Sequence, residues 1–167
     1  MKSSLHCGLS LGLLGMGLWG CATGTVELVE QGDKASRKRV LIAMRQSRFK
    51  DAVAKGVLRG LEEDKCYVKV IDLKKASGQT PAEYGAVVIL NACRAMNMER
   101  HARSFLGSVP DGEKDKIIVL TTTRTGWEAK DQKVDAISSA SKMEDASSLA
   151  ETLVGKIRAV LIRRIRP

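Results

Sequence analysis

Hydroxyl side chains, one glycine and one large aromatic ring follow each other closely in the second half of the chain. Thr121, Thr123 and Thr125 carry hydroxyl groups, Gly126 leaves its backbone accessible, and Trp127 can stack on a flat ring. Hydroxyl and backbone N–H groups bind anions, and the face of a tryptophan binds planar molecules. The run predicts a site for a ligand that is anionic and planar. The alternative is a strand end with Trp127 covering a neighbouring loop.

Ser47 and Asn91 are two further candidates for ligand binding, because each follows an apolar run that predicts a buried strand. The first of these runs covers 39–44 and the second covers 86–90. Ser47 also precedes an expected helix, where a serine side chain can cap the free N–H groups. Basic residues on both sides of Ser47 either attract an anion or simply lie in solvent.

The N-terminus predicts an export signal that ends before a cysteine. Lys2 provides a positive charge, and an uncharged stretch rich in leucine and glycine follows up to Trp19. A basic start, a short apolar core and small residues at the cleavage point describe a secretory signal. The residues Leu18, Trp19, Gly20 and Cys21 resemble the lipobox of bacterial lipoproteins, with Trp19 where that pattern has a small residue.

The lipobox resemblance implies that Cys21 is acylated, with diacylglycerol and palmitate-like chains, and that residues 1–20 are a lipoprotein signal peptide. Because Ala22 follows the cysteine, the resemblance implies the outer membrane of a Gram-negative cell, on the periplasmic side. Residues 21–36 are then expected to form a flexible tether and residues 37–167 a folded domain. The alternatives are a plain signal peptide or an uncleaved anchor, for which the stretch is short, since about 20 apolar residues span a bilayer.

Composition limits the classes of function. The chain has 167 residues, a formal net charge of +9 and 4% aromatic residues, a length that suits one domain of about 100–150 residues with a short appendage. Its two His and four Cys provide no zinc-type ligand set, so no metal site is expected. Export and few aromatic residues argue against nucleic acid as a partner. The expected partners are the membrane, through the lipid anchor, and an envelope protein or a small anionic ligand.

Short apolar runs alternate with amphipathic segments along the expected domain. Apolar strands separated by helices favour a parallel sheet that is covered on both faces. The expected strands are 39–44, 67–73, 86–90, 117–120 and 134–137, and the expected helices are 51–63, 96–106 and 149–165. We expect the strand at 67–73 to lie near an edge of the sheet.

This alternation resembles the flavodoxin-like fold, an α/β doubly wound parallel sheet of about five strands in the order 2-1-3-4-5 with helices on both faces. The resemblance implies a ligand site outside the carboxyl ends of the strands. Flavodoxins bind the phosphate of FMN with a Thr-x-Thr-Gly-x-Thr-like loop after the first strand. The corresponding residues, Met44–Phe49, contain no glycine and one hydroxyl, that of Ser47, so this motif is absent.

Residues 134–141 resemble the Asp-Ala-x-Ser-Gly-Ala-Thr motif of covalent FMN-binding domains. Ser139 replaces the glycine of that motif, Ser141 replaces its first threonine, and Met143 stands at the acceptor position. Covalent attachment of FMN is therefore not expected. The end of a strand followed by a serine-rich turn explains these residues equally well.

Two functions of different classes follow from these patterns. The first is a membrane-anchored envelope lipoprotein whose flavodoxin-like domain binds a ligand or a partner without catalysis. The alternative is an FMN-binding electron-transfer flavoprotein of the cell envelope. Its cofactor-binding residues would be Ser47, Asn91, Thr121, Thr123, Thr125, Gly126 and Trp127. A hydrolase ranks last, because the chain has no Gly-x-Ser-x-Gly elbow and no recognisable nucleophile–base pair.

Overall fold

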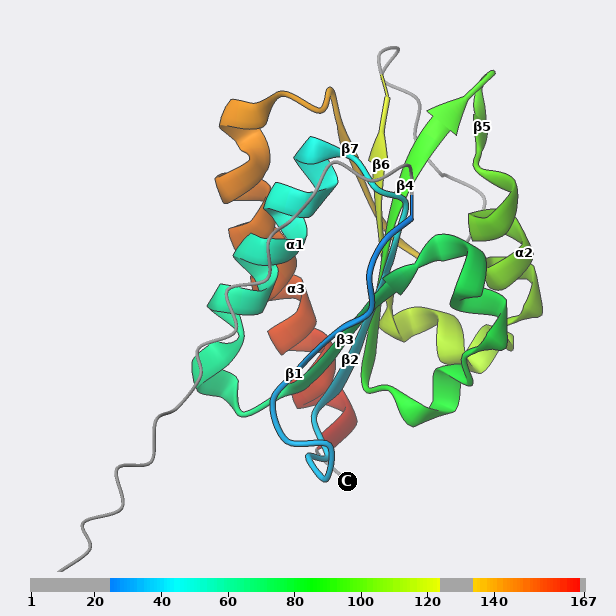
Figure 1. The fold of residues 1–167 in the computed structure, drawn as a ribbon. Coiled ribbons are helices and arrows are strands. Elements are labelled where there is room, and N and C mark those ends of the chain that lie inside the picture. Colours follow the sequence, from blue (N-terminus) through cyan, green and yellow to red (C-terminus); the bar gives the residue numbers. More distant parts are fainter. Residues whose placement is uncertain (1–24, 124–133, 166–167) are drawn as a thin grey trace, which may run out of the picture.

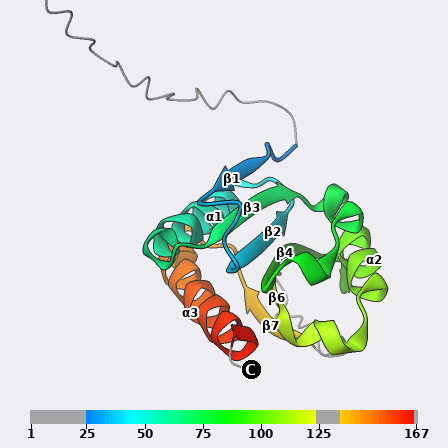
Figure 2. The ribbon, with the colours of Figure 1, turned by 90° about the horizontal axis from the view of Figure 1, so that it is seen from below.

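The computed structural model describes residues 25–123 and 134–165. Their strands are β1 (Val29–Gln31), β2 (Arg39–Met44), β3 (Tyr67–Asp72), β4 (Ala86–Arg94), β5 (Asn97–Met98), β6 (Ile117–Thr122) and β7 (Asp135–Ser139), and their helices are α1 (Arg48–Gly60), α2 (Arg100–Ser108) and α3 (Ala146–Ile165). Short 3-10 helices include η2 (Leu73–Gly78) and η5 (Met143–Asp145). The sheet lies between two layers, with α1 and α3 on one face and α2 on the other (Figures 1 and 2).

The strand order confirms the predicted fold class. Five strands run parallel in the order β3-β2-β4-β6-β7, which in chain order is the 2-1-3-4-5 arrangement of a flavodoxin-like sheet. The short last strand pairs with β6, as the predicted five-strand sheet requires. The carboxyl ends of the five strands lie on one edge of the molecule. We call the residues there the carboxyl-end rim: 45–47, 73–75, 91–99, 123 and 140–145.

The sheet has an apolar core on each face. Val40 and Ile42 of β2 pack in the core beneath α1 and α3, and Leu41 and Ala43 pack in the core beneath α2. All four side chains are fully buried. Because successive side chains of a strand point to opposite faces, a strand that is apolar at every position is buried on both sides. This explains why continuous apolar runs predicted the parallel strands correctly.

The helix expected at 51–63 is α1, Arg48–Gly60, and it begins three residues earlier, directly after the Ser47 cap that the sequence predicts. Ser47 has an extended backbone, and its Oγ accepts a hydrogen bond from the backbone N–H of Lys50 at 3.2 Å. One of the N–H groups that the first turn leaves free is thereby satisfied. The helix then packs through Phe49, Val53 and Val57 against the sheet.

We expect Ser47→Ala to lower the free energy of unfolding by about 1 kcal/mol, the usual cost of losing a serine N-cap. Urea titration followed by circular dichroism measures the change. Ser104→Ala, at an exposed serine inside α2, is the control and should stay within about 0.5 kcal/mol of the wild type. Equal unfolding midpoints for the two variants would contradict a capping role for Ser47.

Strand β1 lies in a segment for which the sequence predicts a flexible tether, residues 21–36. The strand pairs antiparallel with β3, and Val26 before it is buried in the core beneath α1. The side chain of Gln31 donates from Nε2 to the Leu58 carbonyl oxygen at 2.9 Å. From Thr25 onwards this segment is therefore part of the domain. It covers β3, which is therefore the second strand from the edge, and it makes the sheet mixed rather than purely parallel.

The connection after β4 also differs from the prediction. The sequence predicts a helix from Met96, whereas β4 turns back into β5 before α2 begins at Arg100. Ala95 and Met96 form the turn with positive φ angles of 48° and 59°. The resulting β4–β5 hairpin projects beyond the sheet (Figure 1). A two-residue left-handed turn of ordinary side chains gives no recognisable sequence signal, since glycine or asparagine is usual there.

Candidate functional site

Three buried polar side chains meet at the carboxyl-end rim on the α2 side of the sheet. Asn91 and Thr121 are register partners at the ends of β4 and β6. Both face α2, because Ile89 and Val119, two residues earlier on each strand, lie in the core beneath that helix. The Glu99 backbone N–H donates to Asn91 Oδ1 at 3.0 Å. Asn91, Glu99 and Thr121 are 0%, 7% and 1% exposed, so this rim contains a buried polar centre.

Cations surround the carboxylate of Glu99. Arg45 Nη1 donates to Glu99 Oε1 at 2.5 Å. Burial lowers the pKa of Lys50 to about 8; the nearby Glu99 carboxylate acts in the opposite direction, and Arg45 and Arg94 lower the pKa further. These electrostatic effects require the four groups to lie close together. Three cations thus share one buried carboxylate, which leaves an excess of positive charge.

Several polar atoms in this region are buried without a hydrogen-bond partner among the described residues. They are Asn91 Nδ2, Glu99 Oε2, Thr121 Oγ1 and, in the loop after β2, Gln46 Oε1. An unsatisfied buried polar group costs about 1–3 kcal/mol, and native proteins leave few of them. We call Arg45, Lys50, Asn91, Glu99 and Thr121 the polar cluster. Asn91 Nδ2 and Thr121 Oγ1 can donate to a ligand, whereas Glu99 Oε2 and Gln46 Oε1 can only accept. The two unsatisfied donor groups and the net positive charge are the features expected of an anion-binding site.

A hollow of about 600 Å³ lies at the rim between the β4–β5 hairpin and the ends of β6 and β7, and no residue of the polar cluster lines it. Small-molecule sites usually measure about 300–1,000 Å³. A second hollow, of about 480 Å³, lies on the α2 side of the hairpin next to Arg45 and Glu99. Arg94 borders both hollows. The first hollow is lined by Ala92, Cys93, Arg94, Ala95, Met96, Thr122, Thr123, Ala140 and Ser141.

The structure places four of the seven predicted cofactor-binding residues, and all four lie at the same edge of the sheet. Asn91 and Thr121 belong to the polar cluster, and Ser47 caps α1. Thr123 is buried, and its backbone N–H donates to the Ser139 carbonyl oxygen at 2.8 Å, which joins the ends of β6 and β7. The predicted site residues outside the described ranges are Thr125, Gly126, Trp127 and the lipidation candidate Cys21.

Glu99 is the functional residue that sequence reasoning missed. It lies 54 positions from its partner Arg45, and no local pattern links two residues that far apart. The sequence also left open whether the basic residues around Ser47 lie in solvent. Arg48 is exposed, but Lys50 is only 4% exposed. A lysine in the first turn of an amphipathic helix gives no sign that it will be buried.

Metal-ligand groups and membrane-spanning helices are both missing from the described residues. No group of three or more His, Cys, Asp and Glu side chains among them could hold a metal ion. None of the helices in residues 25–123 and 134–165 combines the length and the apolar character that crossing a bilayer requires.

No protein-family model and no curated protein matches the chain, but solved structures do. An oxidoreductase from Corynebacterium diphtheriae is 9% identical with a TM-score of 0.55, over 77% of this chain and 99% of that one. A flavodiiron protein from Giardia intestinalis is 14% identical with a TM-score of 0.52, over 77% of this chain and 38% of that one. A flavodiiron core from Synechocystis is 8% identical with a TM-score of 0.52, over 75% of this chain and 36% of that one.

These likenesses show the fold, which is flavodoxin-like. The chain spans little more than a third of the length of the two flavodiiron proteins. At identities of 8–14% they do not carry over a cofactor or an activity, so the ligand has to be argued from the rim itself.

The rim offers charge and space that a phosphorylated ligand such as FMN would need. The three cations near Glu99 can neutralise a phosphate, and the hollow beside the hairpin is large enough for a ring system. The loop between β2 and α1 contributes one hydroxyl, Ser47, whose oxygen already accepts a hydrogen bond from Lys50 N and whose proton is left for a ligand. The residues therefore fit a phosphate by charge rather than by a hydroxyl-rich loop.

Proposed function

We propose that the carboxyl-end rim binds a phosphorylated planar ligand and that this ligand is FMN. The protein would then be an electron-transfer component of the cell envelope. A lipid on Cys21 would attach it to the membrane. One observation carries the ligand assignment. The polar cluster places a net positive charge, carried by the partly exposed Arg45, and two unsatisfied donor groups where doubly wound sheets bind their ligands.

Each residue of the polar cluster has a distinct part in this proposal. Arg45 and the neighbouring Arg94 would hold the phosphate, and Lys50 would add positive charge from beneath them. Asn91 Nδ2 and Thr121 Oγ1 would supply the hydrogen bonds that the described residues leave open. The hollow between the hairpin and the ends of β6 and β7 would shield the ring from water. Bound FMN supplies one- and two-electron transfer.

The structural neighbours support this choice among phosphorylated ligands. Two of them are named flavodiiron proteins and another is named an oxidoreductase. All three have this fold at low identity, so their names favour FMN as the first ligand to test.

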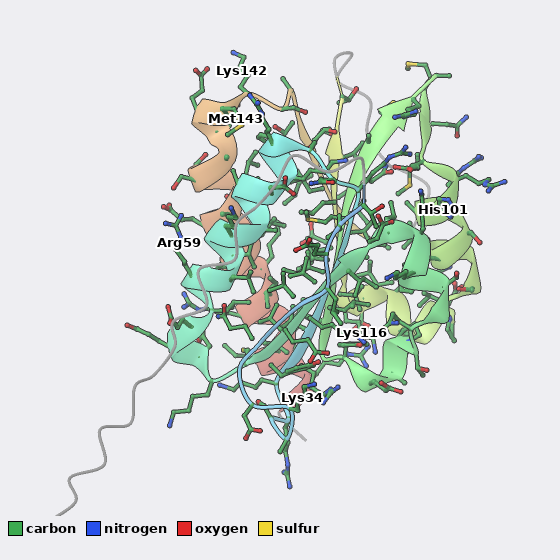
Figure 3. The ribbon with its side chains drawn as sticks, viewed as in Figure 1. Lys34, Arg59, His101, Lys116, Lys142 and Met143 are labelled. Carbon is green, nitrogen blue, oxygen red and sulfur yellow. The ribbon has the colours of Figure 1, made fainter. Side chains whose placement is uncertain are left out.

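We expect the purified protein to quench the fluorescence of added FMN, and Arg45→Gln to weaken this binding about 10- to 100-fold. A hydrogen bond to a charged group is worth about 1.5–3 kcal/mol, which corresponds to that range. Arg59→Gln makes the same change in the last turn of α1, away from the rim, and should leave the affinity unchanged (Figure 3). Wild-type protein that leaves FMN fluorescence unaltered would reject the flavin assignment.

A second candidate is a domain that binds a small anion or an envelope protein without flavin. The observation in its favour is the loop between β2 and α1, which lacks glycine and has only Ser47 as a hydroxyl. Calorimetric titration separates the two candidates. Binding of inorganic phosphate without binding of FMN would favour the second.

We expect Cys21→Ala to abolish metabolic labelling with palmitate and to leave the signal peptide uncleaved, because the lipobox cysteine is the acyl acceptor that the proposal requires. Cys93→Ala removes a different thiol and should leave labelling and processing intact. Labelling that survives in the Cys21→Ala protein would contradict the lipoprotein assignment.

A further inference from the structure

The chain enters the folded domain at the carboxyl-end rim. Because β1 runs antiparallel to β3, the residues before β1 lie beside the end of β3. The Val26 N–H donates to Oδ2 of Asp72, the last residue of β3, at 3.2 Å. Thr25 and Val26 also line a small cavity together with Met44 and Gln46, at the end of β2. The first described residue therefore sits at the same edge of the sheet as the polar cluster.

Only three residues separate Cys21 from Thr25. An extended chain spans at most about 3.6 Å per residue, so Cys21 lies within about 14 Å of Thr25. The six residues of strand β2 cover about 17 Å along the sheet. A lipid on Cys21 therefore reaches the level of the amino ends of the strands only if residues 21–25 run fully extended along the whole sheet. The short tether thus favours contact of the bilayer with the rim over contact with basic residues of the amino-end surface such as Arg37 and Arg163.

Exposed cations adjoin the point of entry. The carboxylate of Asp72 binds Val26 through Oδ2, and its Oδ1 accepts a hydrogen bond from the backbone N–H of Lys74 at 2.8 Å. Lys74 and Lys75 are both exposed, and basic residues at such a surface attract anionic lipids. Exposed cations along this edge include Arg48, Lys74, Lys75, Arg94, Arg100 and Lys142, and exposed carboxylates include Glu27 and Glu144.

Two large apolar side chains project from the same edge. Met96, at the turn of the β4–β5 hairpin, is 59% exposed, and Met143, at the start of η5, is 57% exposed. Met143 and Lys142 lie at the opposite end of the molecule from Lys34 (Figure 3). Apolar side chains beside cations are typical of surfaces that insert at the boundary between lipid headgroups and acyl chains.

We propose that the carboxyl-end rim docks on the headgroups of an anionic phospholipid bilayer, with Met96 and Met143 inserted and Lys74 and Lys75 beside the point of anchoring. The inference rests on the proposed acylation of Cys21, and it adds an orientation to that proposal. The hollow beside the hairpin, lined by Met96 and Ser141, would then open towards the headgroups. Its ligand and its redox partner would be exchanged at the membrane surface.

The test uses the full acylated protein in vesicles of phosphatidylglycerol and phosphatidylcholine that carry bromine on the upper acyl chain. Trp127→Phe removes the tryptophan of residues 21–167, whose fluorescence would interfere with the signal. Single tryptophans then replace Met96, Met143 or, as the control near the amino-end surface, Ile162 on α3. We expect the bromolipid to remove about half of the fluorescence at positions 96 and 143, as insertion to the acyl boundary requires, and little at position 162.

Charge reversal provides a second readout. Lys74→Glu with Lys75→Glu should reduce the quenching at position 96, and the matched pair Arg37→Glu with Arg163→Glu at the amino-end surface should not. Quenching at position 162 without quenching at 96 and 143 overturns the proposed orientation. Mass spectrometry of the intact vesicle-bound protein reports acylation separately. An unacylated mass would contradict the lipoprotein proposal and this inference with it. FMN binding is measured independently of both.

Discussion

Lys50→Met is expected to make the protein more stable than the wild type at pH 7 and to lose that advantage as the pH rises to 10.5. The ammonium group of Lys50 is buried beside two arginines and one carboxylate, and burial lowers its pKa from 10.5 to about 8. At pH 7 the lysine is charged in the folded and the unfolded protein, so the folded protein bears the cost of burying that charge. Methionine fills a similar space without burying a charge.

Between pH 8 and pH 10.5 the folded protein releases the proton of Lys50 while the unfolded chain still holds it. The unfolded state then binds more protons, so the free energy of unfolding of the wild type rises with pH relative to the variant. This pKa difference corresponds to a gain of about 3 kcal/mol in the free energy of unfolding of the wild type relative to the variant. The gain is complete above pH 10.5 and absent below pH 8. Burial raises the pKa of Tyr67 to about 12 and raises the pKa of Cys66, but these groups titrate in both proteins and cancel in the difference.

Urea titrations of both proteins at several pH values from 7 to 10.5 measure this effect. Lys55→Met, at an exposed position of the same helix, is the matched control and should show a nearly constant difference from the wild type. A difference between wild type and Lys50→Met that does not change with pH would mean that the lysine is hydrated in the folded protein. The polar cluster would then not be the buried cationic site that the ligand proposal requires.

Gly32→Ala is expected to lower the free energy of unfolding by about 2–4 kcal/mol, because both the backbone and the space at this position require glycine. Gly32 follows β1 with a φ of +87°, and an added Cβ would lie 2.1 Å from the carbonyl oxygen of Cys66. The contact is with backbone, so the chain itself has to move. The pairing of β1 with β3 is therefore the structure that we expect to be lost first.

Hydrogen exchange locates the loss, and urea titration measures its size. Amides of Val29–Gln31 and of their partners in β3 should exchange faster, while those of β4 and β6 should stay protected. Gly78→Ala is the control, since nothing lies within 4 Å of a Cβ added there, and it should change stability by less than about 0.5 kcal/mol. An unaltered midpoint for Gly32→Ala would show that the turn accommodates a side chain. Release of β1 would also lengthen the segment after Cys21 and reduce the bromolipid quenching at position 96.

The amino-acid sequence by itself determined the central parallel sheet and the start of α1. Continuous apolar runs such as Val40–Ala43 and Ala86–Leu90 have to be buried on all sides, and together with the amphipathic segments between them they indicate a parallel sheet between helices. Ser47 identified the start of α1 because a cap acts on N–H groups two or three residues away. Both signals are local, so they can be recognised before any tertiary contact is known.

Only the tertiary structure decided where the chain enters the domain and which polar groups meet at the rim. Strand β1 has three residues, too few for a periodic pattern, and it exists because β3 offers an unpaired edge. The polar cluster joins Arg45 to Glu99 across 54 positions and buries Lys50, a residue type that sequence rules assign to solvent. Such features depend on pairing between distant segments, whose free energy comes from contacts that neither segment makes alone.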